Sequence, residues 1–95
     1  MTQRSVRNKP PRANAWQVYV VRCADHSLYT GIAVDVTARL ARHNAGKGAK
    51  YTRGRLPVAL VYQESAASYS AALKREHAIK RLPVKHKRAL ISAEI

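Results

Sequence analysis

Apolar and polar side chains form short runs that predict three strands. β-branched and aromatic residues dominate residues 16–23 and, after a turn-forming segment at residues 25–27, residues 28–32. Such residues fit the pleated, half-buried surface of a strand, and two such runs around a short polar segment are typical of a β-hairpin. A further apolar run over residues 58–62 predicts a third strand.

Capping residues mark a first, short helix. Asp35 stands at an N-cap position before Val36 and Leu40, which lie four residues apart and therefore share one helix face. The Asn-Ala-Gly sequence at residues 44–46 is typical of a helix end. The first helix is therefore expected to lie between these two signals.

Two more helices are predicted in the last third of the chain. Ser68 or Ser70 can cap the first of them, and Pro83 interrupts it before a last helix that starts at about residue 84. Between the first helix and the third strand, residues 46–57 combine glycines with Lys and Arg. We expect this segment to be a flexible basic loop.

The composition is that of one small domain. The 95 residues are 46% apolar, which is enough for a modest core. Residues 1–15 carry four cations, two prolines and no acid, so they predict a disordered basic arm ahead of a single domain over residues 16–95. The one cysteine, Cys23, excludes an intramolecular disulfide and Cys-rich zinc folds, and we expect it to be a small buried apolar residue.

The charge points to a polyanionic partner. Eighteen Lys plus Arg against five Asp plus Glu give a net charge of +13, and the self-repulsion of such an excess destabilises a compact state. Nucleic acid is the leading partner, and a solvated basic surface with no dedicated partner is the alternative. A membrane is disfavoured, because the one Trp lies outside any helix signal and no run approaches the ~20 apolar residues that span a bilayer. No signal peptide is readable, so we expect a cytoplasmic protein.

Acidic residues are so scarce that each can be weighed separately. Asp25 suits a turn, Asp35 a cap and Glu94 the terminus, which leaves Glu64 and Glu76. The position of Glu76 predicts that it faces inward on its helix, where an ionised carboxylate is costly unless it is paired or bound to a metal. An internal ion pair with a Lys or Arg is one interpretation. The other is a ligand of a divalent cation on a phosphate-binding surface, because Mg²⁺ is often held by few carboxylates together with water and substrate oxygens.

Two further pairs of residues can share a surface. Arg39 and His43 lie four residues apart on one helix face, and Tyr19 and Tyr29 on adjacent predicted strands can bring their rings together. The structural alternatives are a solvated cation, a helix-end cap for the histidine and core packing for the tyrosines. Neither a Ser-His-Asp trio nor a Gly-rich phosphate loop before a helix is present, so nucleotide hydrolysis and hydride transfer have no support.

The order of these residues resembles the signature of the GIY-YIG endonucleases. The segment at residues 18–20 is followed about ten residues later by the segment at residues 29–31, then by Arg39, His43 and the downstream Glu76. The resemblance covers residues 16–90 and points to small stand-alone bacterial members related to the nuclease domain of the UvrC excision-repair protein. It implies a compact α/β fold in which a three-stranded antiparallel sheet is flanked by helices, which is also the order of elements that the hydrophobic pattern predicts.

The resemblance also implies roles for individual residues. Tyr19 and Tyr29 would be the paired tyrosines, one of which positions or deprotonates the attacking water. Arg39 would hold the scissile phosphate, and His43 would lie beside the tyrosines and accept a proton. Glu76 would bind a single metal ion, Mg²⁺ or Mn²⁺.

This assignment is chemically consistent on one condition, which concerns the base that takes the proton of the attacking water. Phosphodiester hydrolysis builds negative charge that a guanidinium and a metal ion stabilise. A Tyr hydroxyl with its ordinary pKa near ~10 is a poor base, so nearby cations must favour the phenolate or His43 must take the proton. Gly31 matches the glycine of the second motif, at a place where a side chain would obstruct packing or substrate approach.

We therefore expect a divalent-metal-dependent endonuclease that hydrolyses DNA, directed by branched or damaged structure and linked through the resemblance to repair or recombination. A non-catalytic nucleic-acid-binding module of the same fold is the alternative, and an RNA-associated basic protein is a third hypothesis. We expect phosphate contacts, and base stacking by the one tyrosine among them, from the basic loop and the last two helices, with ordinary solvated surface as the alternative: Lys47, Lys50, Tyr51, Arg53, Arg55, Lys80, Lys85, Lys87 and Arg88.

Overall fold

The computed structural model describes residues 15–93. The basic arm predicted for residues 1–15 lies, apart from Ala15, outside the described residues, and so does Glu94. The elements, in chain order, are β1 (Gln17–Arg22), β2 (Leu28–Ala33), α2 (Val36–Asn44), α3 (Lys50–Arg53), β3 (Ala59–Ser65), α4 (Tyr69–Arg81) and α5 (Val84–Ser92). The three predicted strands and the three predicted helices are all present.

Two boundaries differ from the prediction. The segment at residues 46–57 is not wholly a loop, because it contains the single helical turn α3. The third strand runs to Ser65 rather than to residue 62, since its polar end still pairs with β1 at Gln17. Apolar periodicity does not mark this end, because the added strand residues are polar.

The sheet has the order β2-β1-β3, and both pairings are antiparallel. β1 is the central strand, so both of its faces are covered, which explains the uninterrupted apolar run from Val18 to Val21. Tyr19 pairs with Gly31 and Val21 pairs with Tyr29. The two tyrosines are therefore diagonal neighbours on one face of the sheet.

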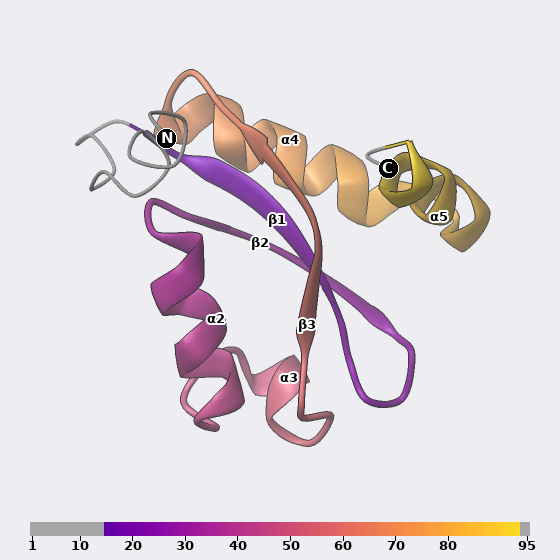
Figure 1. Cartoon of the computed structure of the whole chain (residues 1–95). Coiled ribbons are helices and arrows are strands. Elements are labelled where there is room, and N and C mark those ends of the chain that lie inside the picture. The colour runs from indigo at the N-terminus through magenta and orange to yellow at the C-terminus, as the bar shows by residue number, and fades with distance from the viewer. Residues whose placement is uncertain (1–14, 94–95) are drawn as a thin grey trace, which may run out of the picture.

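Each face of the sheet has its own core. Tyr19 and Val21 pack with Val36 of α2, whereas Val18 and Val20 pack with residues of α4 and α5. Figure 1 shows the resulting layers, with α2 and α3 on one side of the sheet and α4 and α5 on the other. Cys23 is buried in the first core, which confirms its predicted role as a small apolar residue.

Side-chain caps fix where the helices begin and end. Asp35 accepts a hydrogen bond from the backbone N–H of Ala38 at 3.0 Å, and Ser68 does the same for Ala71 at 3.0 Å, which decides between Ser68 and Ser70. α2 ends as predicted, where Gly46 adopts a positive φ of 79° and its N–H bonds to the carbonyl of His43.

One connection that the sequence did not predict closes the segment between α2 and β3. The side-chain amide of Asn44 donates to the carbonyl of Val58 at 3.1 Å and accepts from the N–H of Val58 at 2.8 Å. The end of α2 is thereby fastened to the start of β3. We call residues 45–57, which include the turn α3, the 45–57 loop, and its two ends are held together by Asn44 and Val58.

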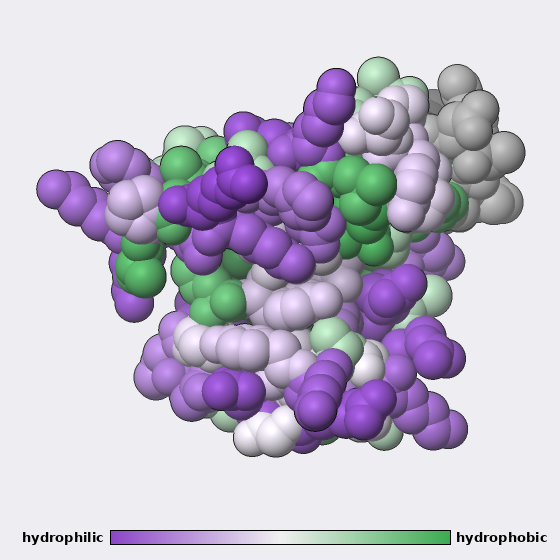
Figure 2. Space-filling model, turned by 180° about the vertical axis from the view of Figure 1, so that it is seen from behind, coloured by the Kyte–Doolittle hydropathy of each residue, from purple (hydrophilic) through white to green (hydrophobic). Residues whose placement is uncertain are grey.

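The face of the molecule seen in Figure 2 is predominantly polar. Figure 2 shows hydrophilic side chains over most of one face, with hydrophobic ones in separate patches. Within residues 15–93 no helix combines the length and the apolar character that crossing a membrane requires.

We predict that Asn44→Ala lowers the free energy of unfolding by about 1–3 kcal/mol, because both hydrogen bonds to Val58 are lost. Urea unfolding followed by circular dichroism measures the change. The matched control is Gln63→Ala, which removes one longer hydrogen bond, at 3.3 Å, on the exposed face and should change stability by less than about 0.5 kcal/mol. Equal stability of Asn44→Ala and the wild type would show that the loop is not held at this point.

Candidate active site

Four of the five predicted catalytic residues line one cavity of about 380 Å³. They come from four different elements: Tyr19 from β1, Tyr29 from β2, Arg39 from α2 and Glu76 from α4. The cavity lies toward the β2 edge of the sheet, and residues of α2 and α4, which cover opposite faces of the sheet, line it. A larger cavity of about 630 Å³ contains none of these residues.

The close approach of Tyr19 to β2 depends on Gly31. A Cβ atom at Gly31 would lie 2.5 Å from the Tyr19 hydroxyl oxygen and 2.7 Å from the adjacent ring carbon, which is closer than such contacts occur. The absent side chain leaves room for the ring to lie over the edge strand. The predicted role of Gly31 in close packing is thereby confirmed.

Glu76 and Arg39 face the cavity from opposite layers. The side chain of Glu76 is only 13% exposed, as the inward position on its helix predicted, and Lys80 Nζ lies 3.2 Å from its Oε2 atom. The ion pair that formed one interpretation of Glu76 is therefore present. Arg39 is exposed and, within residues 15–93, forms no ion pair, so its guanidinium is available to an anion.

His43 lies directly behind this cavity and contacts Tyr19. Its side chain is 1% exposed, and its Nε2 atom is 2.8 Å from the Tyr19 hydroxyl oxygen. The interpretation of His43 as a helix-end cap is wrong, because the imidazole turns inward from the last turn of α2. The ring also meets the ring of Tyr29 edge-on, with 5.5 Å between centroids.

Thr52 is a site residue that the sequence analysis missed. Its side chain is fully buried, and its hydroxyl oxygen lies 2.9 Å from His43 Nδ1 and 2.9 Å from the carbonyl oxygen of Ala49. The three side chains of Tyr19, His43 and Thr52 thus form a continuous buried chain of hydrogen bonds. A threonine inside a basic, glycine-containing segment carries no signal of this burial in a single sequence.

Burial determines the protonation states of Tyr19 and His43. Desolvation, followed by the charges of Tyr29 and Glu76, raises the pKa of Tyr19 to about 12, although Arg39 acts in the opposite direction. Burial and then the charge of Arg39 lower the pKa of His43. At neutral pH the phenol is protonated and the imidazole is neutral, so the tautomer of His43 decides which of the two groups donates in their hydrogen bond. Tyr19 alone is not a ready base.

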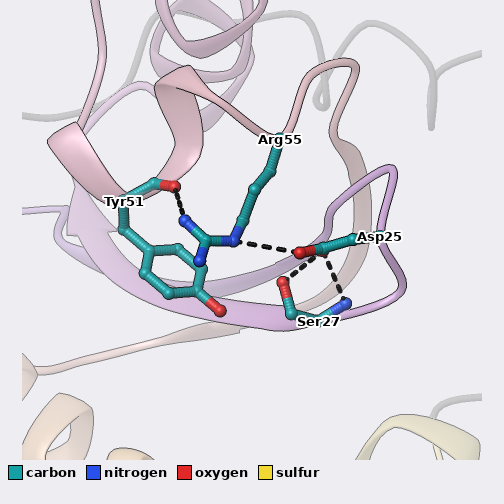
Figure 3. A network of polar contacts seen from close by, with 4 residues as sticks. All are labelled: Asp25, Ser27, Tyr51 and Arg55. Carbon is teal, nitrogen blue, oxygen red and sulfur yellow. Dashed lines mark hydrogen bonds and ion pairs between the residues drawn. The ribbon is translucent and has the colours of Figure 1, made fainter.

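Tyr51 is held in a network of its own. Its ring stacks on the ring of Tyr29 at 5.9 Å, and the guanidinium of Arg55 lies 4.0 Å from the centroid of the Tyr51 ring. Figure 3 shows how Arg55 also donates to the Tyr51 carbonyl at 2.7 Å and pairs with Asp25 at 3.0 Å. Tyr51 is still 39% exposed, so stacking of its ring on a base stays a prediction.

The other predicted phosphate contacts divide into two groups. Lys87 and Arg88 of α5 line a smaller cavity of about 280 Å³, to which Tyr51 also contributes and which we call the second cavity. Lys80 Nζ lies 5.8 Å from the centroid of the Tyr29 ring. Lys80 thus lies over Tyr29, and Lys87 and Arg88 share a cavity with Tyr51. The remaining cations are exposed and line neither this second cavity nor the first: Lys47, Lys50, Arg53 and Lys85.

Two aromatic residues that the sequence analysis did not select also line the first cavity. The rings of Trp16 and Tyr69 are 4.9 Å apart and tilted by 56°, and Tyr69 is 53% exposed. For Tyr69 the sequence did offer a signal, because an aromatic residue directly after the capping Ser68 is not needed for the core.

Comparison with known proteins identifies one family model and several relatives that are similar to this chain. The family model of the GIY-YIG catalytic domain matches residues 15–88. A UPF0213 protein of Desulfotalea psychrophila is 52% identical over 80 residues, which cover 83% of this chain and 73% of the relative. A UPF0213 protein of Natronomonas pharaonis is 54% identical over 77 residues, which cover 81% of this chain and 91% of the relative.

Solved structures agree with the sequence relatives. The solution NMR structure of a UPF0213 protein of Bacillus halodurans superposes with a TM-score of 0.55 and 42% identity, covering 83% of this chain and 84% of that one. That of a protein of E. faecalis gives a TM-score of 0.59 at 35% identity, covering 87% and 88%. Together with the family match and the assembled Tyr, Arg, His and Glu side chains, these likenesses show that the chain belongs to the GIY-YIG family, among the UPF0213 proteins.

Proposed function

We propose that this protein is an endonuclease that hydrolyses phosphodiester bonds of DNA with the help of a divalent metal ion. The observation that supports it best is the convergence of Tyr19, Arg39 and Glu76 on one cavity, with His43 hydrogen-bonded behind Tyr19. These groups supply a proton path, a cation for the phosphate and a carboxylate in one place. The family's nuclease domain makes nucleic acid the expected substrate.

The proton path runs from water through Tyr19 to His43. Water in the cavity gives a proton to the phenol oxygen while Tyr19 passes its own proton to His43 Nε2, and the hydroxide formed attacks phosphorus. This route avoids a free phenolate, which the raised pKa of Tyr19 disfavours. Arg39 binds the non-bridging oxygens, on which negative charge grows in the transition state.

Glu76 is the residue that fits a metal ion. Its carboxylate faces the cavity and is paired with a lysine through one oxygen, which leaves the other oxygen for a cation. Within residues 15–93 no three carboxylate, His or Cys side chains gather into a larger ligand set, so water and phosphate oxygens would complete the shell of Mg²⁺ or Mn²⁺. A bound ion would stabilise charge on the leaving oxygen.

The cations around the second cavity suggest the path of the DNA. From Arg39 the path would cross Lys80 and the Tyr29–Tyr51 stack and reach Lys87 and Arg88 on α5. These contacts read the phosphate backbone and not the bases, which favours recognition of DNA shape. We propose branched or damaged DNA as the substrate, and repair or recombination as the setting.

We predict that Glu76→Gln lowers the cleavage rate by at least about 100-fold and leaves DNA binding within about twofold, because the variant keeps the shape and loses the metal ligand. Cleavage of supercoiled plasmid and of nicked, flapped and branched duplexes, with Mg²⁺, Mn²⁺ or EDTA, measures the rate. Lys74→Gln, on the same helix but outside the cavity, is the matched control. Binding without cleavage by the wild type itself would replace the nuclease with a binding module.

We predict that cleavage falls on the acid side with a midpoint below pH 6.5, the ordinary pKa of His. Burial lowers the pKa of His43, and only the neutral ring can accept the proton of Tyr19, so activity is lost as pH falls through this lowered pKa. Single-turnover rates from about pH 5 to 8 measure the midpoint. Binding by fluorescence anisotropy over the same range is the control, and a midpoint above 6.5 contradicts the assignment.

We predict that the double variant Lys87→Gln/Arg88→Gln reduces the slope of log Kd against log salt concentration by about 2, because two phosphate contacts are lost. The matched control, Lys74→Gln/Arg81→Gln, removes the same charge from α4 outside both cavities. Its slope should change by less than about 1. The same slope for both double variants would show that net charge, and not this surface, determines binding.

A further inference from the structure

The hydroxyl proton of Thr52 can lie in only one direction. Its oxygen is 2.9 Å from the carbonyl oxygen of Ala49, and a carbonyl has no proton to share. Unless the Thr52 hydroxyl donates to Ala49, the lone pairs of two oxygen atoms face each other at this distance. The single hydroxyl proton is therefore used at Ala49.

This direction determines which nitrogen of His43 carries a proton. The Thr52 oxygen, having donated its proton, can only accept from His43 Nδ1 at 2.9 Å, so Nδ1 is protonated. In the neutral ring Nε2 then has a free lone pair, and it is this atom that lies 2.8 Å from the Tyr19 hydroxyl. The opposite tautomer would leave Nδ1 as an acceptor facing an oxygen whose proton is engaged elsewhere.

The loop that carries Thr52 is packed against the imidazole. A Cβ atom at Gly48 would collide with His43 Nδ1 and would lie 2.8 Å from the His43 Cα atom. The backbone of the loop therefore lies directly on the ring. The buried ring therefore has little room to change its orientation.

We propose that Thr52 is a positioning residue that holds His43 in the Nδ1–H tautomer, so that Nε2 faces Tyr19 as a proton acceptor. Its effect on catalysis rests on the proposed nuclease function, whereas the tautomer itself does not. Thr52 does not line the cavity. It acts through His43, as a partner that fixes ring orientation and tautomer does in other histidine-dependent sites.

The first measurement needs neither DNA nor metal. Long-range ¹H–¹⁵N spectra of the imidazoles, recorded at a pH where His43 is neutral and assigned with a His43→Gln variant, report which ring nitrogen is protonated. We expect a protonated Nδ1 and a bare Nε2 in the wild type and in Thr52→Ser. We expect a mixture of tautomers in Thr52→Val, which keeps the shape and loses the hydroxyl. A protonated Nε2 in the wild type would overturn the proposal without any variant.

The second measurement is kinetic. Thr52→Val should lower kcat on the order of 10–100-fold with KM within about twofold, and Thr52→Ser should restore most of the rate. A folded Thr52→Val protein with the wild-type tautomer and the wild-type kcat would overturn the proposal. If the tautomer changes as expected and the wild type does not cleave DNA, the tautomer assignment holds and the nuclease function fails.

Discussion

The buried hydrogen bond between Tyr19 and His43 is the contact on which the arrangement of the site depends. It joins the central strand to the last turn of α2, and both of its residues are at most 2% exposed. Gly31 leaves space for the Tyr19 ring and Gly48 for the His43 ring, because a side chain at either position would collide with that ring. A buried polar group left without its partner costs about 1–3 kcal/mol, so each ring needs the other for stability as well as for chemistry.

The scarcity of acids gives Glu76 its special position. Asp35 caps a helix, and Asp25 holds a turn. Glu64 pairs with Arg75 at 2.7 Å, and although burial opposes it, this contact lowers the pKa of Glu64. Among these residues only Glu76 faces the cavity. A bare carboxylate repels a phosphate, so in a phosphate-binding cavity this position is favourable only when a cation lies beside it.

The sequence predicted the secondary structure but not several contacts between segments that are distant along the chain. Strands, caps and helix ends follow from periodicity and capping residues, because these signals depend on neighbours in the chain. α3, the clamp made by Asn44 and the burial of Thr52 depend on contacts across the fold, which no local pattern encodes. The residues that the family resemblance selected do lie together in the fold, four of them around one cavity and His43 against Tyr19, but the resemblance could not reveal the contacts of the Tyr51 ring with Tyr29 and Arg55.

Residues 45–57 connect folding to the site. The loop is closed at its ends by Asn44 and Val58, and it is tied to the β1–β2 hairpin because the carbonyl of Arg55 accepts from the N–H of Ala24 at 2.8 Å. Few side chains of this segment enter either core, so its position comes from these hydrogen bonds and from aromatic stacking. The same segment carries Thr52 and places it against His43. Any loosening of the loop would therefore act directly on the imidazole, which Thr52 and Gly48 contact.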